Sequence, residues 1–374
     1  MKKSFVSKIK LSQLAVWENI KKQRIPLSFG LELTARCNNN CRHCYINLPA
    51  ADKKAKEKEL SFDEIKKIVD QAVDLGAAWC LITGGEPLLR EDFFDIYLYL
   101  KKKGVLTSVF TNATLINQRH IKFFQNYPPR DIEVTVYGVT RKTYESVTRK
   151  SGSFEAFMTG LNLLLQSGIK VRFKTMALRS NLKELPRISA FCRERSDDYF
   201  RFDPFLQLRF DGNKERNNEI KSERLRPEEI GAIEKKDLER LRALEKECDK
   251  FILPGLAYTD CDRLFRCGAG RDSFTVGYDG FLRLCPSLYH PSCIRNLKKG
   301  SLSEAWQDFI PRVRDMRSKR KEFLAKCRKC ELINLCPWCP AHAYLETGEL
   351  DTPVDYFCKI AHVKAEFLLP ALSK

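Results

Sequence analysis

Short apolar runs alternate with helical patterns from about residue 27 to residue 210. The apolar runs have the length of strands and read LSFGLEL, AAWCLIT, VLTSVF, DIEVTVY, IKVRFKTM and YFRFDPFLQL. The segments between them have helical spacing and read SFDEIKKIVDQAVDLG, EDFFDIYLYLKKKG, LINQRHIKFFQNY, SFEAFMTGLNLLLQSG and KELPRISAFCRER. Several of these segments begin with Ser or Asp and end with Gly, as helix capping favours. Strand–helix alternation of this kind predicts parallel β/α units, and six repeats predict an α/β fold with a partial (β/α)6 barrel of the TIM type.

The pattern differs in the rest of the chain. Residues 1–26 have apolar positions that suit an amphipathic helix packed on the main domain. Residues 213–256 are highly charged and helical in pattern, which predicts a bridge rather than core. Residues 257–374 are rich in cysteine and have few strand or helix signals apart from SLSEAWQDFI, so we expect their fold to depend on bound metal. The predicted barrel domain therefore spans 27–212, between the N-terminal segment and the bridge.

Composition limits the class of protein. The 374 residues are 43% hydrophobic and 30% charged, values typical of soluble globular proteins. No apolar run reaches the roughly 18 residues of a membrane-spanning helix, and charges interrupt the N-terminal apolar positions too often for a signal peptide. We therefore expect a cytoplasmic protein that does not bind a membrane.

Charge and cysteine content narrow the chemistry further. The net charge of +18 could suggest nucleic-acid binding, but Lys and Arg are spread along the whole chain and no nucleic-acid fold signature appears. We interpret the charge as mostly solvated surface, with an acidic peptide partner as the alternative. The 15 cysteines point to metal or cluster ligation, because the cytoplasm keeps thiols reduced.

Three cysteines follow the first predicted strand. Cys37, Cys41 and Cys44 have the spacing C-x3-C-x2-C in LTARCNNNCRHCYIN. They lie where the carboxyl ends of barrel strands carry the active site. Three thiolates would leave one iron of a [4Fe–4S] cluster free to bind a small molecule. The alternative is a zinc site with His43 as the fourth ligand, although its position between two cysteines is awkward for tetrahedral closure.

A second motif follows the second predicted strand. LITGGEPLLR places Thr83, Gly84, Gly85, Glu86 and Pro87 at the end of that strand. Two glycines would let the backbone approach a ligand closely, and the Glu can pair with an ammonium group. A tight turn that ends at Pro87 is the purely structural interpretation.

The two motifs together resemble those of the radical S-adenosylmethionine (radical SAM) enzymes. This resemblance implies that the free iron chelates S-adenosylmethionine, whose reductive cleavage gives a 5′-deoxyadenosyl radical. It also implies that Gly84, Gly85 and Glu86 hold the methionine amino group. The stretch SVFTNAT resembles the ribose-contacting strand end of the family and nominates Ser108 and Asn112. His43 is then expected near the cluster without ligating it, and Cys80 in the core.

The C-terminal half contains eight further cysteines with ligand-like spacing. They are Cys261, Cys267, Cys285, Cys327, Cys330, Cys336, Cys339 and Cys358. Eight thiolates suffice for two fully ligated [4Fe–4S] clusters, and two zinc knuckles are the alternative. This half resembles the SPASM domain found in the same family.

The SPASM resemblance implies two sets of ligands. The first auxiliary cluster would use Cys261, Cys267, Cys285 and Cys339, and the second would use Cys327, Cys330, Cys336 and Cys358. Cys336 and Cys339 are separated by two residues, where the best-known members have three, so the division of ligands is the weaker part of the analogy. Cys293 is a spare thiol near Cys285, either a substitute ligand or a packed side chain. Cys192 and Cys248 fall on predicted helices, where a structural role is expected.

The resemblance predicts an enzyme that oxidatively modifies a peptide or protein, by crosslinking or by side-chain oxidation. Partners would be that substrate, possibly a separate leader-binding protein, and an electron donor such as flavodoxin or ferredoxin. The alternatives are a radical SAM enzyme acting on a small molecule or cofactor precursor, and a non-enzymatic zinc-binding module. Sulfatase maturases have Asp directly after the cysteine equivalent to Cys285, whereas Pro286 and Ser287 follow here, which argues against formylglycine formation. The sequence identifies no general base, and Tyr137 is either part of the substrate pocket or packing.

Overall fold

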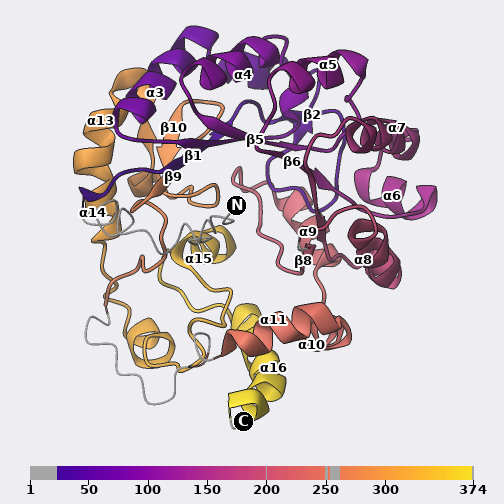
Figure 1. Ribbon diagram of the computed structural model, residues 1–374. Helices are drawn as coiled ribbons and strands as arrows, with labels where there is room; N and C mark the ends of the chain where they lie inside the picture. Colours follow the sequence, from indigo (N-terminus) through magenta and orange to yellow (C-terminus); the bar gives the residue numbers. More distant parts are fainter. Residues whose placement is uncertain (1–22, 199, 249–251, 253–261, 373–374) are drawn as a thin grey trace, which may run out of the picture.

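A curved parallel sheet with helices on its outer side forms the first half of the molecule. The computed structural model describes residues 23–198, 200–248, 252 and 262–372. The six predicted strands are present as β1 (Ser28–Glu32), β4 (Trp79–Thr83), β5 (Leu106–Thr111), β6 (Asp131–Thr135), β7 (Val171–Met176) and β8 (Arg201–Asp203). Each pairs in parallel with the next. The predicted α/β fold with a partial barrel is therefore confirmed, and Figure 1 shows the strands as an arc.

The helices between these strands follow the predicted segments closely. They are α3 (Phe62–Asp74), α4 (Phe93–Lys102), α5 (Gln118–Asn126), α7 (Ser153–Gln166) and α8 (Leu185–Arg193), and two shorter helices that the sequence did not predict are α2 (Lys53–Lys58) and α6 (Arg141–Thr148). α3 begins at a capping box, in which Ser61 and Glu64 satisfy each other's backbone N–H groups. Its buried face carries Ile65, Ile68, Val69 and Ala72, the spacing that an amphipathic helix presents to a core.

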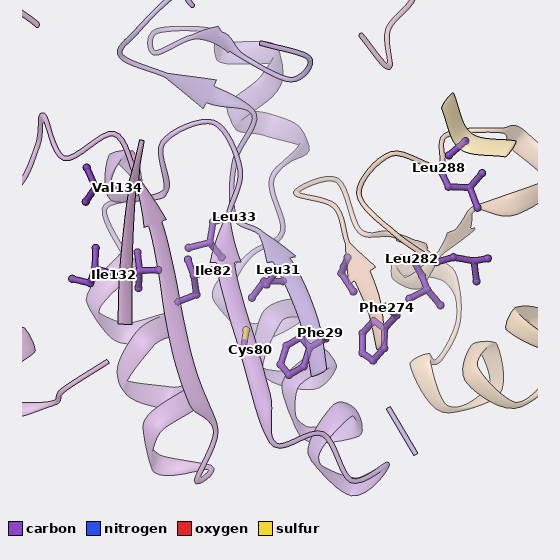
Figure 2. Close-up of a cluster of buried hydrophobic side chains, with 14 of the residues drawn as sticks. Phe29, Leu31, Leu33, Cys80, Ile82, Ile132, Val134, Phe274, Leu282 and Leu288 are labelled. Atoms are coloured by element: carbon purple, nitrogen blue, oxygen red, sulfur yellow. The ribbon is translucent and has the colours of Figure 1, made fainter. Parts of the chain in front are cut away.

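The hydrophobic core lies between the sheet and these helices. Figure 2 shows Phe29, Leu31, Cys80 and Ile82 from β1 and β4 pointing into it. Cys80 is 2% exposed and belongs to this core, as expected. Phe274 stacks on Phe29 with ring centroids 5.6 Å apart, so the C-terminal half contributes to the same core.

The C-terminal half extends the sheet beyond β1. β9 (Ser273–Val276) pairs in parallel with β1, and β10 (Phe281–Arg283) and β11 (Arg295–Asn296) continue in antiparallel order. These short strands were not predicted, because the sequence has few strand or helix signals in this region. The segment SLSEAWQDFI is helical, as α13 (Leu302–Glu304), a π-helical turn η6 (Ala305–Phe309) and the start of α14 (Ile310–Arg314).

The charged segment after the barrel forms three helices, α9 (Lys214–Glu223), α10 (Pro227–Lys236) and α11 (Leu238–Lys246). α10 packs on the C-terminal helix α16 (Asp355–Leu372), so closely that a Cβ added at Gly231 would lie 2.6 Å from Val363. The Glu234 carboxylate in this contact is fully buried and pairs with Lys364 at 3.0 Å. The segment is helical as predicted, and α10 has a buried face as well.

The remaining elements are short. They are the strands β2 (Arg36–Cys37) and β3 (Leu48–Pro49), helix α15 (Pro340–Thr347), and the single turns η2 (Pro87–Leu89), η3 (Leu182–Glu184), η4 (Pro291–Cys293), η5 (Leu297–Lys299) and η7 (Phe323–Cys327). The helix expected within residues 1–26 falls almost entirely outside the described residues. Among the described helices, none combines the length and apolar character needed to cross a membrane.

Candidate cofactor and active site

The three N-terminal cysteines lie on one loop at the carboxyl ends of the barrel strands. Cys37 ends β2, and the Asn39 backbone N–H donates to the Cys37 sulfur at 3.4 Å. The loop is fixed to the end of α6, because the N–H groups of Asn40 and Arg42 donate to the carbonyls of Thr148 and Val147 at 2.9 and 3.1 Å. The cysteines are therefore held in place by backbone hydrogen bonds.

The surroundings of these thiols fit a bound cluster. Burial raises the pKa of Cys37, and the nearby negative charges of Glu86, Cys41 and Cys44 raise it further. Cys41 is buried and Cys37 and Cys44 are half-buried, and three such neighbouring thiols ionise readily only if a bound cation compensates their charge. Among the described residues, no three His, Cys, Asp or Glu side chains converge as a single-ion site requires. When bound, a [4Fe–4S] cluster would be held by Cys37, Cys41 and Cys44 through three of its irons.

The Gly84–Gly85 loop packs directly against the segment that precedes Cys37. Gly85 and Glu86 donate their N–H groups to the carbonyls of Thr34 and Arg36 at 2.7 and 2.9 Å. A Cβ at Gly84, where φ is +132°, would lie 2.3 Å from the Thr34 oxygen, and a Cβ at Gly85 would lie 2.2 Å from the Arg36 oxygen. The close approach that requires these glycines is thus made, at least in part, by the protein's own backbone.

The Glu86 side chain joins the ends of β4 and β5. One carboxylate oxygen accepts from the Thr111 hydroxyl at 2.9 Å and from the Leu88 N–H at 3.2 Å. The other accepts from the Asn112 N–H at 2.8 Å. Burial raises the pKa of Glu86 to about 7, against the lowering effect of these hydrogen bonds. The carboxylate that was expected to bind an ammonium group therefore also has a structural role.

Asn112 lies beside the cysteine loop. Its side-chain N–H2 is 3.8 Å from the Cys37 sulfur and donates to Asn38 at 3.0 Å, while its oxygen accepts from Thr114. Ser108 is on β5, four residues before Asn112, and lines the interior of the barrel. Of the two predicted ribose contacts, Asn112 is thus at the cysteines and Ser108 lines the barrel cavity described next.

One cavity of about 830 Å³ runs along the inside of the barrel. Its walls include Leu81 and Thr83 of β4 and Ser108 of β5. On the other side it is bounded by Cys285 and Pro286 of the cysteine-rich half. The cavity therefore connects the strands next to the Gly84–Gly85 loop with a predicted ligand of the first auxiliary cluster.

Charged side chains line much of this cavity. The lining includes Arg130, Arg172, Arg201 and Arg240, with Asp131 and Glu133 as the acidic residues. Lys174 pairs with Glu133 at 2.8 Å and lies 3.5 Å from the Phe110 ring centroid. Three of the four arginines have acidic neighbours, which are Asp131 for Arg130 and Arg172 and Glu234 for Arg240. The Arg201 side chain has no hydrogen-bond or ion-pair partner within the described residues, so it is the guanidinium most available to an anionic ligand.

The C-terminal cysteines form two groups. Burial is the largest cause of the raised pKa of Cys339, and the negative charges of Cys285 and Cys267 raise this pKa further. These three thiols are therefore neighbours. Cys261, the fourth ligand expected with them, lies outside the described residues. The other group is Cys327, Cys330, Cys336 and Cys358. Burial is the largest cause of the raised pKa of Cys336, and the negative charges of the other three thiols raise this pKa further. The two ligand sets that the SPASM resemblance implies stay a prediction.

The other singled-out residues have packing environments. Cys293 is fully buried and its sulfur contacts the Met316 sulfur at 3.6 Å. Cys192 is buried on α8, and Cys248 is buried just after α11. Tyr137 packs against His43, with ring centroids 5.1 Å apart, and its side chain hydrogen-bonds the Cys41 thiol, so it lies at the cysteine loop and not among the cavity-lining residues. Burial lowers the pKa of His43 to about 4, so it is neutral there.

Sequence reasoning missed the charged interior and one buried ion pair. Glu32, at the end of β1, pairs with Arg283 on β10, and both side chains are almost fully buried. The sequence did contain a sign of the charged interior. In IKVRFKTM the charged Arg172 and Lys174 alternate with the apolar Val171 and Phe173, and this period of two places both charged residues on one face of the strand. Glu32 likewise interrupts the apolar run LSFGLEL.

Comparison with known proteins agrees with this geometry. The family model described as the radical SAM superfamily matches residues 31–192, and that of the SPASM iron-sulfur cluster-binding domain matches residues 267–331. The AdoMet-dependent heme synthase of Methanosarcina barkeri is 25% identical over 348 residues, which cover 87% of this chain and 94% of that protein. The subtilosin biosynthesis protein AlbA of Bacillus subtilis is 25% identical over 84% of this chain and 71% of its own length.

Solved structures share the fold. Streptococcus suis SuiB bound to S-adenosylmethionine superposes with a TM-score of 0.65 at 16% identity and covers 91% of this chain and 78% of its own. Native anSMEcpe with bound AdoMet superposes with a TM-score of 0.66 at 16% identity over 93% of this chain and 98% of its own. Radical SAM and SPASM domains imply [4Fe–4S] clusters and S-adenosylmethionine as cofactors. The chain is therefore a radical SAM enzyme with a C-terminal SPASM domain.

Proposed function

We propose that this enzyme oxidatively modifies a peptide or protein, by forming a crosslink or by oxidising a side chain. The observation that carries the proposal is one continuous cavity that extends from Thr83 and Ser108 to Cys285. A substrate held there would lie between the half that binds S-adenosylmethionine and the half that binds the auxiliary clusters. When bound, S-adenosylmethionine and its cluster would supply a radical that takes one hydrogen atom from the substrate. The auxiliary clusters would accept the electron that the substrate then loses together with a proton.

The roles of individual residues belong to the same proposal. Cys37, Cys41 and Cys44 would hold the cluster with the open iron, and the loop at Gly84, Gly85 and Glu86 would bind the methionine part of S-adenosylmethionine. Since both Glu86 carboxylate oxygens accept hydrogen bonds within the protein, this loop's backbone carbonyls would share in contacting the amino group. Ser108 and Asn112 remain the proposed ribose contacts. The eight C-terminal cysteines would hold two auxiliary clusters, with flavodoxin or ferredoxin as the electron donor.

An open edge of the barrel supports an extended substrate. β8 is the last strand of the sheet, and in the described part of the chain no further strand pairs with its outer edge. Arg201 of β8 lines the cavity, so a peptide that entered along this edge would reach the interior. Extended peptides commonly bind by adding to a free strand edge. AlbA takes part in subtilosin biosynthesis, and SuiB and anSMEcpe have been solved with peptides bound.

The residues after Cys285 argue against formylglycine formation. Pro286 occupies the position where sulfatase maturases have an Asp, and it has no proton-accepting side chain. Ser287 follows, and its hydroxyl donates to the Gln207 side chain. Neither residue offers a free carboxylate next to the cluster ligand Cys285.

A random-sequence peptide library tests the proposal. The anaerobically reconstituted enzyme would be incubated with the library, S-adenosylmethionine and dithionite, and products would be analysed by mass spectrometry. We expect peptides that have lost two hydrogen atoms, formed in proportion to 5′-deoxyadenosine. A Cys267/Cys285→Ala variant should still release 5′-deoxyadenosine but should not form the oxidised peptide. If neither intact nor variant enzyme modifies any peptide while S-adenosylmethionine is cleaved, the peptide proposal is wrong.

A carboxylate-rich small molecule is the second candidate. Four arginines line the cavity, and guanidinium groups bind carboxylates well. The AdoMet-dependent heme synthase and the Fe-coproporphyrin III synthase of Methanosarcina barkeri are each similar over most of this chain. Consumption of iron-coproporphyrin III in the same assay, with no peptide product, would favour this candidate. Arg201→Gln would then raise the KM for the porphyrin about tenfold or more, because one charge-assisted hydrogen bond contributes about 1.5–3 kcal/mol.

A further inference from the structure

Tyr144 is a buried tyrosine whose hydroxyl has no partner among the described residues. The residue lies on α6 and is fully buried. Its hydroxyl oxygen has no contact with solvent and no hydrogen bond. Buried hydroxyl groups are nearly always hydrogen-bonded, because leaving one unpaired costs its whole desolvation free energy. The missing partner is therefore expected to be a group that binds to the protein.

The ring of Tyr144 is held rigidly. It stacks on Phe157 with centroids 4.7 Å apart and an interplanar angle of 24°, and it contacts Phe154 and Tyr137 at 5.7 and 5.9 Å. Its backbone is also tightly packed, because a Cβ at Gly138 would lie 2.7 Å from the Tyr144 nitrogen. The hydroxyl therefore cannot readily turn away to find another partner.

α6 places this hydroxyl next to the cysteine loop. The Val147 and Thr148 carbonyls at the end of α6 accept hydrogen bonds from the loop residues Arg42 and Asn40. Tyr144 lies one turn earlier, and residues three and four apart share a helix face. Burial is the largest cause of the raised pKa of Tyr144. The next largest causes are the negative charges of Cys41, Glu86 and Cys37.

Two further unpartnered groups lie on the cysteine loop itself. Asn39 is 4% exposed, and neither its side-chain nitrogen nor its oxygen has a hydrogen-bond partner among the described residues. The Nδ1 atom of His43 is likewise buried and unpartnered. Unsatisfied polar groups therefore gather at the site where the family membership requires a bound cluster.

We propose that the Tyr144 hydroxyl donates a hydrogen bond to a sulfur of the cluster held by Cys37, Cys41 and Cys44, and thereby raises its reduction potential. The acceptor would be a bridging sulfide, because the thiolates already belong to the protein and none of them, among the described residues, accepts from this hydroxyl. Hydrogen bonds to cluster sulfurs stabilise the more negatively charged reduced state. Tyr144 is thus a positioning and tuning residue that does not itself react.

Tyr144→Phe removes only the hydroxyl oxygen and keeps the packed ring. The control is Tyr97→Phe, since Tyr97 is equally buried but its hydroxyl donates to the Tyr127 carbonyl at 2.9 Å. The reduction potential of the N-terminal cluster would be measured by redox titration monitored by EPR, with that cluster identified by its response to S-adenosylmethionine. We expect Tyr144→Phe to retain its iron and to disfavour reduction up to about tenfold, which is about 59 mV for one electron. Tyr97→Phe should leave the potential unchanged.

Two outcomes would overturn the proposal directly. One is an unchanged potential in a Tyr144→Phe protein that contains its full complement of iron. The other is a potential that changes only after S-adenosylmethionine is added, because the hydroxyl would then bind the cosubstrate and not the cluster.

The Tm of the Cys37/Cys41/Cys44→Ala protein, which would keep its auxiliary clusters, decides the case in which Tyr144→Phe fails to bind the cluster. In that protein the Tyr144 hydroxyl is unpaired, so adding Tyr144→Phe should not lower the Tm, whereas adding Tyr97→Phe should lower it. An unchanged Tm supports the proposal. A Tm lowered as much as by Tyr97→Phe would show that the hydroxyl has a protein partner, and the proposal would be wrong.

Discussion

Glu32 at the end of β1 and Arg283 on β10 form a buried ion pair that joins the barrel to the cysteine-rich half. The exposed fractions of the two side chains are 1% and 2%. The Arg283 guanidinium also lies 4.1 Å from the Tyr289 ring centroid. Arg283 is the last residue of β10 and lies two residues before Cys285, so the ion pair fixes the end of the strand that leads to a predicted cluster ligand.

Breaking this ion pair from one side should destabilise the protein strongly. Arg283→Met leaves the Glu32 carboxylate buried without its partner, which costs about 3–5 kcal/mol of the free energy of unfolding. The double variant Arg283→Met/Glu32→Leu removes both charges and should recover most of that loss. Urea unfolding followed by circular dichroism measures both values.

An exposed ion pair provides the matched control. Lys56 and Glu91 are 2.9 Å apart with side chains 57% and 87% exposed, so Lys56→Met should cost less than about 1 kcal/mol. A double variant at Glu32 and Arg283 that is no more stable than Arg283→Met would contradict the role assigned to the ion pair.

Gly84 should not tolerate any side chain. In Gly84→Ala the new methyl group would lie 2.3 Å from the Thr34 oxygen, so the segment before Cys37 must move. We expect loss of the iron bound by the N-terminal cysteines, measured as about four fewer irons per chain. Gly104 also has a positive φ, of +76°, but nothing lies within 4 Å of its added Cβ. Gly104→Ala should therefore lose about 1–2 kcal/mol of stability and no iron. Equal iron loss in both variants would contradict the steric explanation.

Cys293 should not be a cluster ligand. Its buried sulfur packs on Met316, so Cys293→Val keeps an apolar side chain of similar size there. We expect this variant to keep its iron content, whereas Cys285→Val should lose about four irons. Iron loss from Cys293→Val without unfolding would instead make Cys293 a substitute ligand.

His120 should make stability depend on pH in the mildly acidic range. Burial lowers the pKa of His120 from its ordinary value of 6.5 to about 4 in the folded protein. The unfolded chain therefore binds a proton before the folded chain does, and stability is lost as the pH falls from about 6.5 towards 4. His120→Leu should reduce that loss, in a comparison of urea midpoints for the two proteins at pH 7 and pH 5. The same decrease in both proteins would contradict this assignment.

The sequence was sufficient to predict the barrel, because each strand and helix there has a strong local pattern. β4 is an apolar run bounded by turns, and α3 combines a capping box with an apolar face. β9, β10 and β11 were missed because they have only two to four residues and are stabilised by pairing with a distant strand. β9 pairs with β1 across more than 240 residues of sequence, and no local pattern reports such a pairing.

The candidate site was predictable in its residue types but not in its detailed contacts. Cysteine spacing was enough to propose two C-terminal groups, and the structure brings together the cysteines in each that it describes. The hydrogen bonds that occupy Glu86 could not be predicted, because they depend on how the ends of β4 and β5 meet. Tyr144 was also missed, because the sequence does not show that its buried hydroxyl lacks a hydrogen-bond partner among the described residues.

We expect the protein to hold one cluster with an open iron and two fully ligated auxiliary clusters. Iron and sulfide per chain, after anaerobic reconstitution, test this expectation most directly in the intact protein and in a Cys37/Cys41/Cys44→Ala variant. We predict about twelve irons in the intact protein and about eight in the variant, with reductive cleavage of S-adenosylmethionine lost in the variant. An intact protein that bound about two zinc ions and no iron would contradict the account.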